Sequence, residues 1–342
     1  MTKVFVGMSG GVDSSVTAAL LVEQGYDVTG IYMKNWSQNL PGMKCPWAED
    51  LADAKRVAVR LGIDFEVFDF ETEYRHKVVD YMIDEYKAGR TPNPDIMCNQ
   101  EVKFKLFLDT ALERGADMIA TGHYARTQDG KLLQAVDANK DQTYFLYRVT
   151  SAALERTLFP LGGYTKQQVR AMAAEHGLWT AGKKESMGVC FVGQVGIREF
   201  LGQYVEATPG DIIDQQTGKK LGRHDGAIFY TLGQRHGLDV GGGLPYYVVG
   251  KDMEQGEVYV TTDLNDQQLW RSEIPLGATH WIGGTPPLDG AYQIRVRHRA
   301  PLIEASLIGA MLHLTEPERA VTAGQSVVIY DGDVCLGGGI VS

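Results

Sequence analysis

The chain has 342 residues, 44% of them hydrophobic and 22% charged, which is typical of a globular protein with two or three domains. Its formal net charge of −10 argues against non-specific binding to nucleic acid, so any RNA contact requires basic residues gathered on one face. The sequence has neither an apolar run long enough to span a bilayer nor the apolar core of a signal peptide. We therefore expect a cytoplasmic protein without a membrane partner.

The four cysteines, Cys45, Cys98, Cys190 and Cys335, form no Cys-x-x-Cys pair. We therefore expect no zinc or iron–sulfur centre, no fixed metal site in the protein, and free thiols at rest. Cys98 and Cys190 lie in polar segments, whereas buried structural cysteines favour apolar elements, so these two are candidates for reactive thiols. Cys335 lies in an apolar, strand-like segment and is expected to be structural, and the role of Cys45 stays open.

The first chemical motif is a glycine- and serine-rich turn at residues 9–15. It follows an apolar run at 4–8, expected to be a buried strand, and precedes a helical pattern at 16–24. The adjacent Gly10 and Gly11 let backbone N–H groups approach a ligand, and together with the helix dipole these groups form an anion site. The spacing fits neither a Walker loop nor a dinucleotide fingerprint. It resembles the Ser-Gly-Gly-x-Asp-Ser loop of ATP pyrophosphatases, which split ATP between its α and β phosphates.

Asp13 places a carboxylate beside this anion site. It either orders the loop by accepting its N–H groups or helps to hold a Mg²⁺ that bridges the phosphates, and the sequence leaves both roles open. A simple helix cap would explain the serines and the aspartate, but it would not need the double glycine.

The following segments alternate between strand and helix, which predicts a parallel α/β domain. We expect strands at 27–33, 65–70 and 116–124, and helices at 48–61, 72–88, 104–114, 165–176 and 198–204. In an open parallel sheet, ligands bind beyond the carboxyl ends of the strands. Met33 therefore lies where an adenine could be received beside the phosphate loop.

Residues 89–99 form a polar stretch that contains Pro92 and Pro94. Two prolines one residue apart predict a rigid loop rather than a helix. This loop would present three polar side chains, Asn93, Asp95 and Cys98.

From about residue 206 the chain reads as all-β, because turn signals separate short β-rich pieces. Strands are expected at 228–230, 246–249, 258–260, 292–297 and 326–330. A second β unit begins near 270 and is expected to be a small barrel. We predict a catalytic ATP-pyrophosphatase-like domain at 1–205, a central β-rich domain at 206–268 and a C-terminal β-barrel domain at 269–342.

Eight segments match the motifs of one family in order: 7–14, 33–36, 89–95, 120–124, 140–142, 188–191, 231–235 and 335–340. The chain resembles the tRNA-specific 2-thiouridylases of the MnmA/TrmU family, in their bacterial form, within the ATP-pyrophosphatase loop superfamily. The resemblance runs from the first strand to the last residues, and the ordered set of motifs makes it specific.

The resemblance implies a tRNA-uridine 2-sulfurtransferase that uses ATP, with Mg²⁺ accompanying the nucleotide. The enzyme would adenylate the C2 oxygen of the wobble uridine in tRNAs for Lys, Glu and Gln. A cysteine persulfide would then deliver sulfur to C2, with AMP and pyrophosphate as products. The implied partners are the anticodon stem-loop of tRNA and a persulfide donor, either a cysteine desulfurase or a sulfur-relay protein.

By motif match, Cys190 would carry the persulfide, Cys98 would be the nucleophile and Asp95 an acid or base. The implied ATP-binding positions are Gly7, Met8, Ser9, Gly10, Gly11, Val12, Asp13, Ser14, Met33 and Gly122. The implied contacts to the target base and tRNA are Asn93, Pro94, Asp95, His123, Lys140, Asp141, Gln142, Arg297, His298 and Gln325. The family often has an aromatic residue where this chain has His298, and an imidazole can also stack on a base.

Seven basic residues are candidates for an RNA-binding face: Lys103, Lys105, Lys140, Lys183, Lys184, Arg297 and Arg299. Two other functions stay compatible with the phosphate loop. An amide- or guanidine-forming ligase on the same core would not need Cys98 or Cys190. A nucleotide- or RNA-binding module would bind ATP but release no AMP when tRNA is added.

Overall fold

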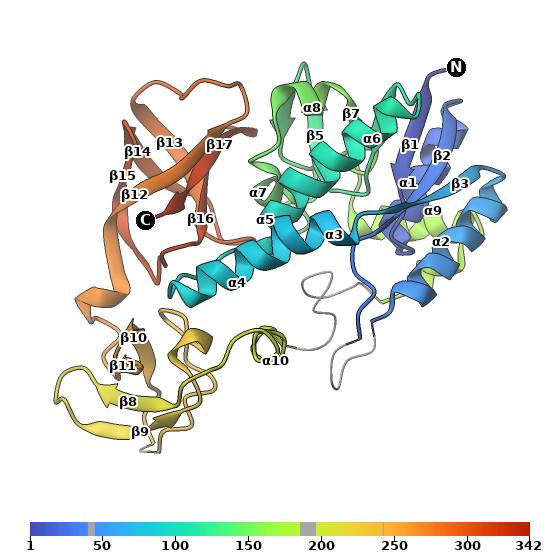
Figure 1. The fold of residues 1–342 in the computed structure, drawn as a ribbon. Coiled ribbons are helices and arrows are strands. Elements are labelled where there is room, and N and C mark those ends of the chain that lie inside the picture. Colours follow the sequence, from blue (N-terminus) through green and yellow to red (C-terminus); the bar gives the residue numbers. More distant parts are fainter. Residues whose placement is uncertain (40–44, 185–195, 242) are drawn as a thin grey trace.

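The computed structural model describes residues 1–39, 45–184, 196–241 and 243–342. Its strands form a five-stranded, a four-stranded and an eight-stranded sheet. Figure 1 shows the α/β part in blue and green, the four-stranded sheet in yellow and the barrel in orange and red. None of the helices in these ranges has the length and apolar character required to cross a bilayer.

The first sheet is parallel and has the order β3-β2-β1-β4-β7. Its strands are β1 (Lys3–Gly7), β2 (Asp27–Lys34), β3 (Asp64–Asp69), β4 (Met118–Ala120) and β7 (Thr157–Leu158). Side chains of β1 alternate between two cores: Val4 and Val6 pack with Val16 and Val169, whereas Phe5 packs with Phe107 on the opposite face. Helices therefore cover both faces, which explains why β1 is a continuous apolar run.

The described helices confirm the predicted alternation. They are α1 (Val12–Glu23), α2 (Trp47–Leu61), α3 (Glu71–Tyr74), α4 (Asp80–Lys87), α5 (Pro94–Met97), α6 (Phe107–Glu113), α7 (Thr143–Leu146), α8 (Ser151–Glu155), α9 (Lys166–Glu175) and α10 (Ile197–Leu201). A π-helical stretch, Arg75–Val79, joins α3 to α4 where the sequence predicts one helix at 72–88.

The expectation of a non-helical loop over 89–99 is wrong from Pro94 onward. Pro94 is the first residue of α5, where a backbone N–H would have no hydrogen-bond partner within the helix, so proline is tolerated there. Asn93 caps this helix, because its side-chain oxygen accepts the backbone N–H of Asp95 at 3.1 Å. A π-helical stretch, Cys98–Leu106, then continues into α6, so Cys98 lies inside a helical run.

The second sheet has the order β10-β11-β8-β9. Its strands are β8 (Gly210–Asp214), β9 (Lys220–His224), β10 (Tyr247–Asp252) and β11 (Glu257–Thr261). Ile212, Tyr230 and Val258 belong to its small apolar core. The strand expected at 228–230 is wrong, because Ala227–Phe229 forms a turn of 3₁₀ helix.

The third sheet confirms the predicted barrel. Six strands follow the order β12-β15-β14-β13-β16-β17, and an antiparallel pairing of β12 with β17 closes the ring. They are β12 (Trp270–Trp281), β13 (Gly290–Arg295), β14 (Ile303–Ile308), β15 (Met311–Arg319), β16 (Ser326–Asp331) and β17 (Val334–Val341). The hairpin β5 (Arg126–Gln128) and β6 (Lys131–Leu133), which comes from the α/β part, extends this sheet next to β17. The exact domain boundaries stay a prediction.

Candidate functional site

A glycine-rich turn lies at the carboxyl end of β1, next to β4, where the strand order changes direction. Gly10 has φ +73°, and a Cβ atom on it would lie 2.3 Å from the carbonyl oxygen of Asp50. Only glycine therefore fits this position. The Ser14 hydroxyl accepts the backbone N–H of Ser9 at 3.1 Å and donates to the Gly11 carbonyl at 3.2 Å. These bonds hold the turn ahead of α1.

Segments that follow three different strands meet at this turn. A Cβ atom on Gly122, beyond β4, would lie 2.9 Å from the backbone nitrogen of Ser14. A Cβ atom on Gly7 would lie 3.0 Å from Cε of Met33, which belongs to β2. The fold thus brings together the ATP-binding positions expected from the sequence, at the edge where open parallel sheets bind ligands.

Asp13 binds two side chains that the sequence did not connect with it. The ammonium of Lys166 lies 2.7 and 2.8 Å from its two carboxylate oxygens, and the Tyr124 hydroxyl donates to it at 2.9 Å. Lys166 is the first residue of α9, which Thr165 caps as predicted through a capping box with Gln168. In the described structure Asp13 thus binds a cation and a phenol, two contacts that the sequence did not predict.

Lys183 forms a second bridge to the phosphate loop. Its ammonium donates to the Gly10 carbonyl at 3.1 Å and to Asp50 and Asp53 at 2.8 and 2.7 Å. Burial alone would lower the pKa of Lys183, but the two carboxylates raise it above its ordinary value. The sequence made Lys183 a candidate for an RNA-binding face, whereas the fold places its charge between the loop and α2.

The described residues contain no group of three or more metal-ligating side chains. Both carboxylate oxygens of Asp13 are engaged by Lys166. The positive charge beside Asp13 in the described structure is therefore that of Lys166.

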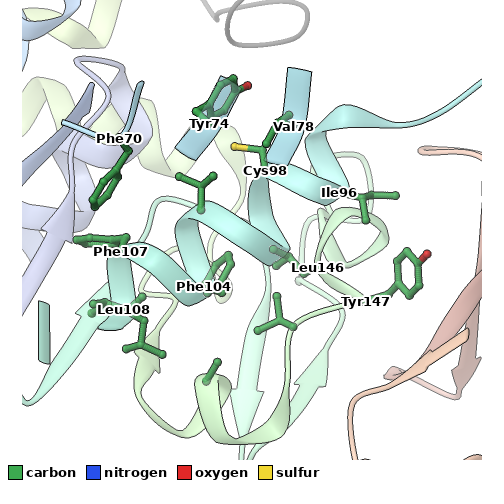
Figure 2. Packing of buried hydrophobic residues seen from close by; sticks show 14 of the residues in the cluster. Phe70, Tyr74, Val78, Ile96, Cys98, Phe104, Phe107, Leu108, Leu146 and Tyr147 are labelled. Atoms are coloured by element: carbon green, nitrogen blue, oxygen red, sulfur yellow. The ribbon is translucent and has the colours of Figure 1, made fainter. Parts of the chain in front are cut away.

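Cys98 is only 2% exposed, although its sequence neighbours are polar. Figure 2 shows its side chain near Tyr74, Val78 and Ile96, which belong to the same apolar cluster. Helix formation explains the difference, because it points Cys98 toward this cluster, and the adjacent Asn99, also buried, donates to the Phe145 carbonyl at 3.1 Å.

Asp95 lies one turn before Cys98 in the same helical run. Burial raises the pKa of the Asp95 carboxyl, and the nearby charge of Lys103 opposes that rise in part. A carboxyl group with a raised pKa keeps its proton closer to neutral pH, which suits a general acid.

His123 and Asp141 lie in the interior. His123 is 8% exposed, packs between Phe104 and Phe159, and its Nδ1 lies 2.8 Å from the Thr121 hydroxyl. Burial, followed by the charge of Lys103, lowers the pKa of His123 well below its usual value, which keeps the ring neutral.

Asp141 forms a buried ion pair that joins the α/β part to the barrel. Its carboxylate accepts from Arg295 at 2.9 Å, from the Thr143 hydroxyl at 2.7 Å and from the backbone N–H of Ala135 at 3.0 Å. The other expected tRNA positions gather around this junction. Arg297 and His298 follow β13, and Gln325 precedes β16, which pairs with β13.

The His298 ring packs on Phe145 with centroids 4.4 Å apart. Burial, with a contribution from Arg299, lowers the pKa of His298 to about 4. Arg297 binds Glu318 at 2.6 Å, and the Gln142 side chain accepts the backbone N–H of Tyr124 at 2.9 Å. Lys140 and Gln325 are half-buried.

The other three cysteines are Cys190, Cys335 and Cys45. Cys190 lies outside the described residues. Cys335 is 1% exposed and burial raises its pKa, which agrees with a structural role. Cys45 is also buried, and burial raises its pKa.

A parallel sheet with a glycine-rich turn at its edge, a small β sheet and a closed barrel define a three-part class of protein, and family models match the three parts in the same order. Residues 2–194 match the tRNA methyl transferase HUP domain, 198–262 the tRNA methyl transferase PRC-barrel domain, and 271–341 the aminomethyltransferase beta-barrel domain.

Similar proteins carry one name. The tRNA-specific 2-thiouridylase MnmA of Bacillus pumilus (strain SAFR-032) is 47% identical over 353 residues, covering 99% of this chain and 95% of the relative. The protein of the same name from Pseudomonas aeruginosa (strain UCBPP-PA14) is 47% identical over 354 residues, covering 99% and 94%. A solved 4-thiouridine synthetase–RNA complex with bound ATP aligns at 19% identity with a TM-score of 0.41, covering 59% of this chain and 50% of that one. The chain belongs to the family of tRNA-specific 2-thiouridylases.

Proposed function

We propose that this protein is a tRNA-uridine 2-sulfurtransferase that thiolates C2 of the wobble uridine in tRNAs for Lys, Glu and Gln. The observation that carries the proposal is the approach of Met33 to Gly7 and of Gly122 to Ser14 at one edge of the sheet, in a chain 47% identical along its length to named 2-thiouridylases. The RNA substrate would be tRNA, in keeping with the names of these relatives, and the protein would contact its anticodon stem-loop.

ATP would bind at the turn of residues 8–14. The backbone N–H groups at the start of α1 would hold its phosphates, and Met33 would lie beside the adenine. Mg²⁺ would arrive on the phosphates of ATP, because Asp13 is already paired with Lys166. Its bound charge would neutralise the leaving pyrophosphate.

The chemistry would proceed in two stages. The C2 oxygen of uridine would attack the α phosphorus of ATP and release pyrophosphate, which converts a poor leaving group into AMP. The terminal sulfur of a Cys190 persulfide would then bond to C2 and expel AMP. The Cys98 thiolate would attack the Cys190 sulfur, leaving a thiocarbonyl on the base and a Cys98–Cys190 disulfide that an external thiol reduces.

Asp95 would act as the acid or base, since burial raises its carboxyl pKa. Asn93 and Pro94 would hold the flipped uracil beside it. The persulfide would come from a cysteine desulfurase or a sulfur-relay protein.

Sulfur loading of cysteine variants tests this proposal. Each variant is incubated with a desulfurase and radiolabelled cysteine, and label on protein and on tRNA is measured separately. We expect Cys190→Ser to lose both labels, and Cys98→Ser to keep label on the protein but not on tRNA. Cys335→Ser, on the barrel, is the matched control and should label tRNA. Thiolation of tRNA by Cys190→Ser would overturn the assignment. If the wild type also leaves tRNA unlabelled while both variants form AMP at its rate, the ligase alternative would be favoured.

A further inference from the structure

Thr91 precedes the helical run that carries Asp95 and Cys98, and it forms hydrogen bonds to both β-rich parts of the molecule. The backbone N–H of Thr91 donates to the Ala323 carbonyl of the barrel at 3.0 Å. The Thr91 hydroxyl lies 3.2 Å from the Thr231 hydroxyl, which precedes β10 in the central part. Gly324 has φ +89°, and a Cβ atom on it would lie 2.8 Å from the Thr91 nitrogen. Thr91 is thus a point where all three parts of the chain meet.

The Thr231 side of this junction is itself held in place. The side-chain oxygen of Gln234 accepts the backbone N–H of Thr231 at 3.0 Å. Gly233 has φ +78°, and a Cβ atom on it would lie 2.4 Å from Cβ of Ala320 in the barrel. The motif at 231–235, which the proposed chemistry does not use, therefore braces the Thr91 contact.

Two residues of β10 and the turn after it lie beside the junction. The ammonium of Lys251 donates to the carbonyl oxygen of Tyr230 at 2.8 Å, and burial lowers the pKa of Lys251 to about 8. A Cβ atom on Gly89, which has φ +75°, would lie 2.9 Å from Cγ of Met253. The segment before Thr91 thus packs against the turn after β10.

The link from Thr91 to Cys98 is short and stiff. Pro92 follows Thr91 directly and is buried. Asn93 then caps α5, and the helical run continues from Pro94 through Cys98. Proline fixes φ and a capped helix fixes its successors, so a shift at Thr91 is passed on to Asp95 and Cys98.

We propose that Thr91 and Thr231 are positioning residues that couple the two β-rich parts to the Asn93–Cys98 reactive segment. The proposal deepens the proposed sulfur-transfer function and rests on it for its catalytic readout. Neither hydroxyl needs to touch substrate. Their mutual hydrogen bond, with the Thr91–Ala323 bond, sets where the helix that carries Asp95 and Cys98 begins.

The test uses the full chain and compares Thr91→Val, which removes the hydroxyl, with Thr91→Ser, which keeps it. Thr262→Val is the matched control, because Thr262 is exposed just beyond β11. The first readout is the alkylation rate of Cys98 with iodoacetamide, followed by mass spectrometry of the Cys98 peptide. The Cys335 peptide reports general loosening, since Cys335 is buried in the barrel sheet.

We expect Thr91→Val to raise Cys98 alkylation about fivefold, because losing one hydrogen bond shifts a local opening by about that factor. Alkylation of Cys335 should not change. Turnover of tRNA-dependent AMP formation should fall about tenfold, with the KM for tRNA unchanged, because the reacting groups are misplaced rather than unbound. Thr91→Ser and Thr262→Val should behave as wild type.

Thr231→Val should reproduce Thr91→Val, and the double variant should be no worse than either, because both remove the same bond. If Thr91→Val does not fold, Thr231→Val gives the same measurement from the other side. Wild-type Cys98 reactivity in both variants, or a parallel rise at Cys335, would overturn the proposal. A wild-type protein that forms no AMP would instead defeat the proposed function, and the alkylation experiment would still decide this inference.

Discussion

Replacing Lys166 by methionine should weaken nucleotide binding at the phosphate loop. The Lys166 ammonium contacts both oxygens of Asp13, which lies in the first turn of α1. Methionine keeps most of the side-chain volume and removes the charge. Asp13 would then carry an uncompensated negative charge beside the place where the phosphates bind.

The magnitude follows from what the ion pair neutralises. The Lys166 ammonium lies 2.7 Å from an Asp13 oxygen and cancels most of its charge. Without it, the Asp13 carboxylate would repel phosphates bound at the turn, although its 32% exposure lets water screen part of that repulsion. We expect ATP binding to weaken by about 1–3 kcal/mol, which corresponds to a decrease in ATP affinity of roughly 5- to 150-fold.

Titration of the purified variants with ATP, by calorimetry without tRNA, measures this loss. Lys55→Met is the matched control, because Lys55 is exposed on α2 of the same part of the chain, and it should bind ATP as wild type does. Asp13→Asn in the Lys166→Met background should recover part of the affinity, since it removes the uncompensated charge. Wild-type affinity in Lys166→Met, or a further loss in the double variant, would refute the reasoning.

Three further predictions concern the barrel junction and RNA binding. Arg295→Met should lower the free energy of unfolding in urea by about 3–5 kcal/mol, because it leaves the buried Asp141 carboxylate without its cation. The control Arg56→Met, which breaks an exposed ion pair, should lower it by less than about 1 kcal/mol. Equal losses would contradict this. As pH falls from about 6.5 to 4, the wild type should lose more stability than His298→Gln. The reason is that His298 takes up a proton near pH 6.5 in the unfolded chain but only near pH 4 in the folded protein. Parallel pH profiles of the two proteins would contradict this prediction. Affinity for tRNA should fall steeply with salt in filter-binding assays, and a flat curve would exclude phosphate contacts as the main attraction.

The local signals of the sequence predicted many of the elements and the glycine-rich turn at 9–15 well. The double glycine after an apolar strand predicted the turn that the structure places at the edge of the sheet, and Thr165 caps α9 as expected. These succeed because backbone conformation and capping depend on residues a few positions apart. The same local reasoning failed at Pro94, because proline breaks a helix interior but is favoured at its first residue.

The sequence by itself determined the alternation of strands and helices in the first part, the glycine-rich turn and the family resemblance, all of which are carried by short contiguous motifs. Only the tertiary structure decided which distant residues meet. It pairs Asp13 with Lys166, Asp141 with Arg295 and Thr91 with Thr231, partners separated by more than a hundred residues. It also buries Cys98 within a polar-looking segment. Such partners depend on how sheets and helices pack, and periodicity along the chain shows which face of an element is apolar without showing what that face will contact.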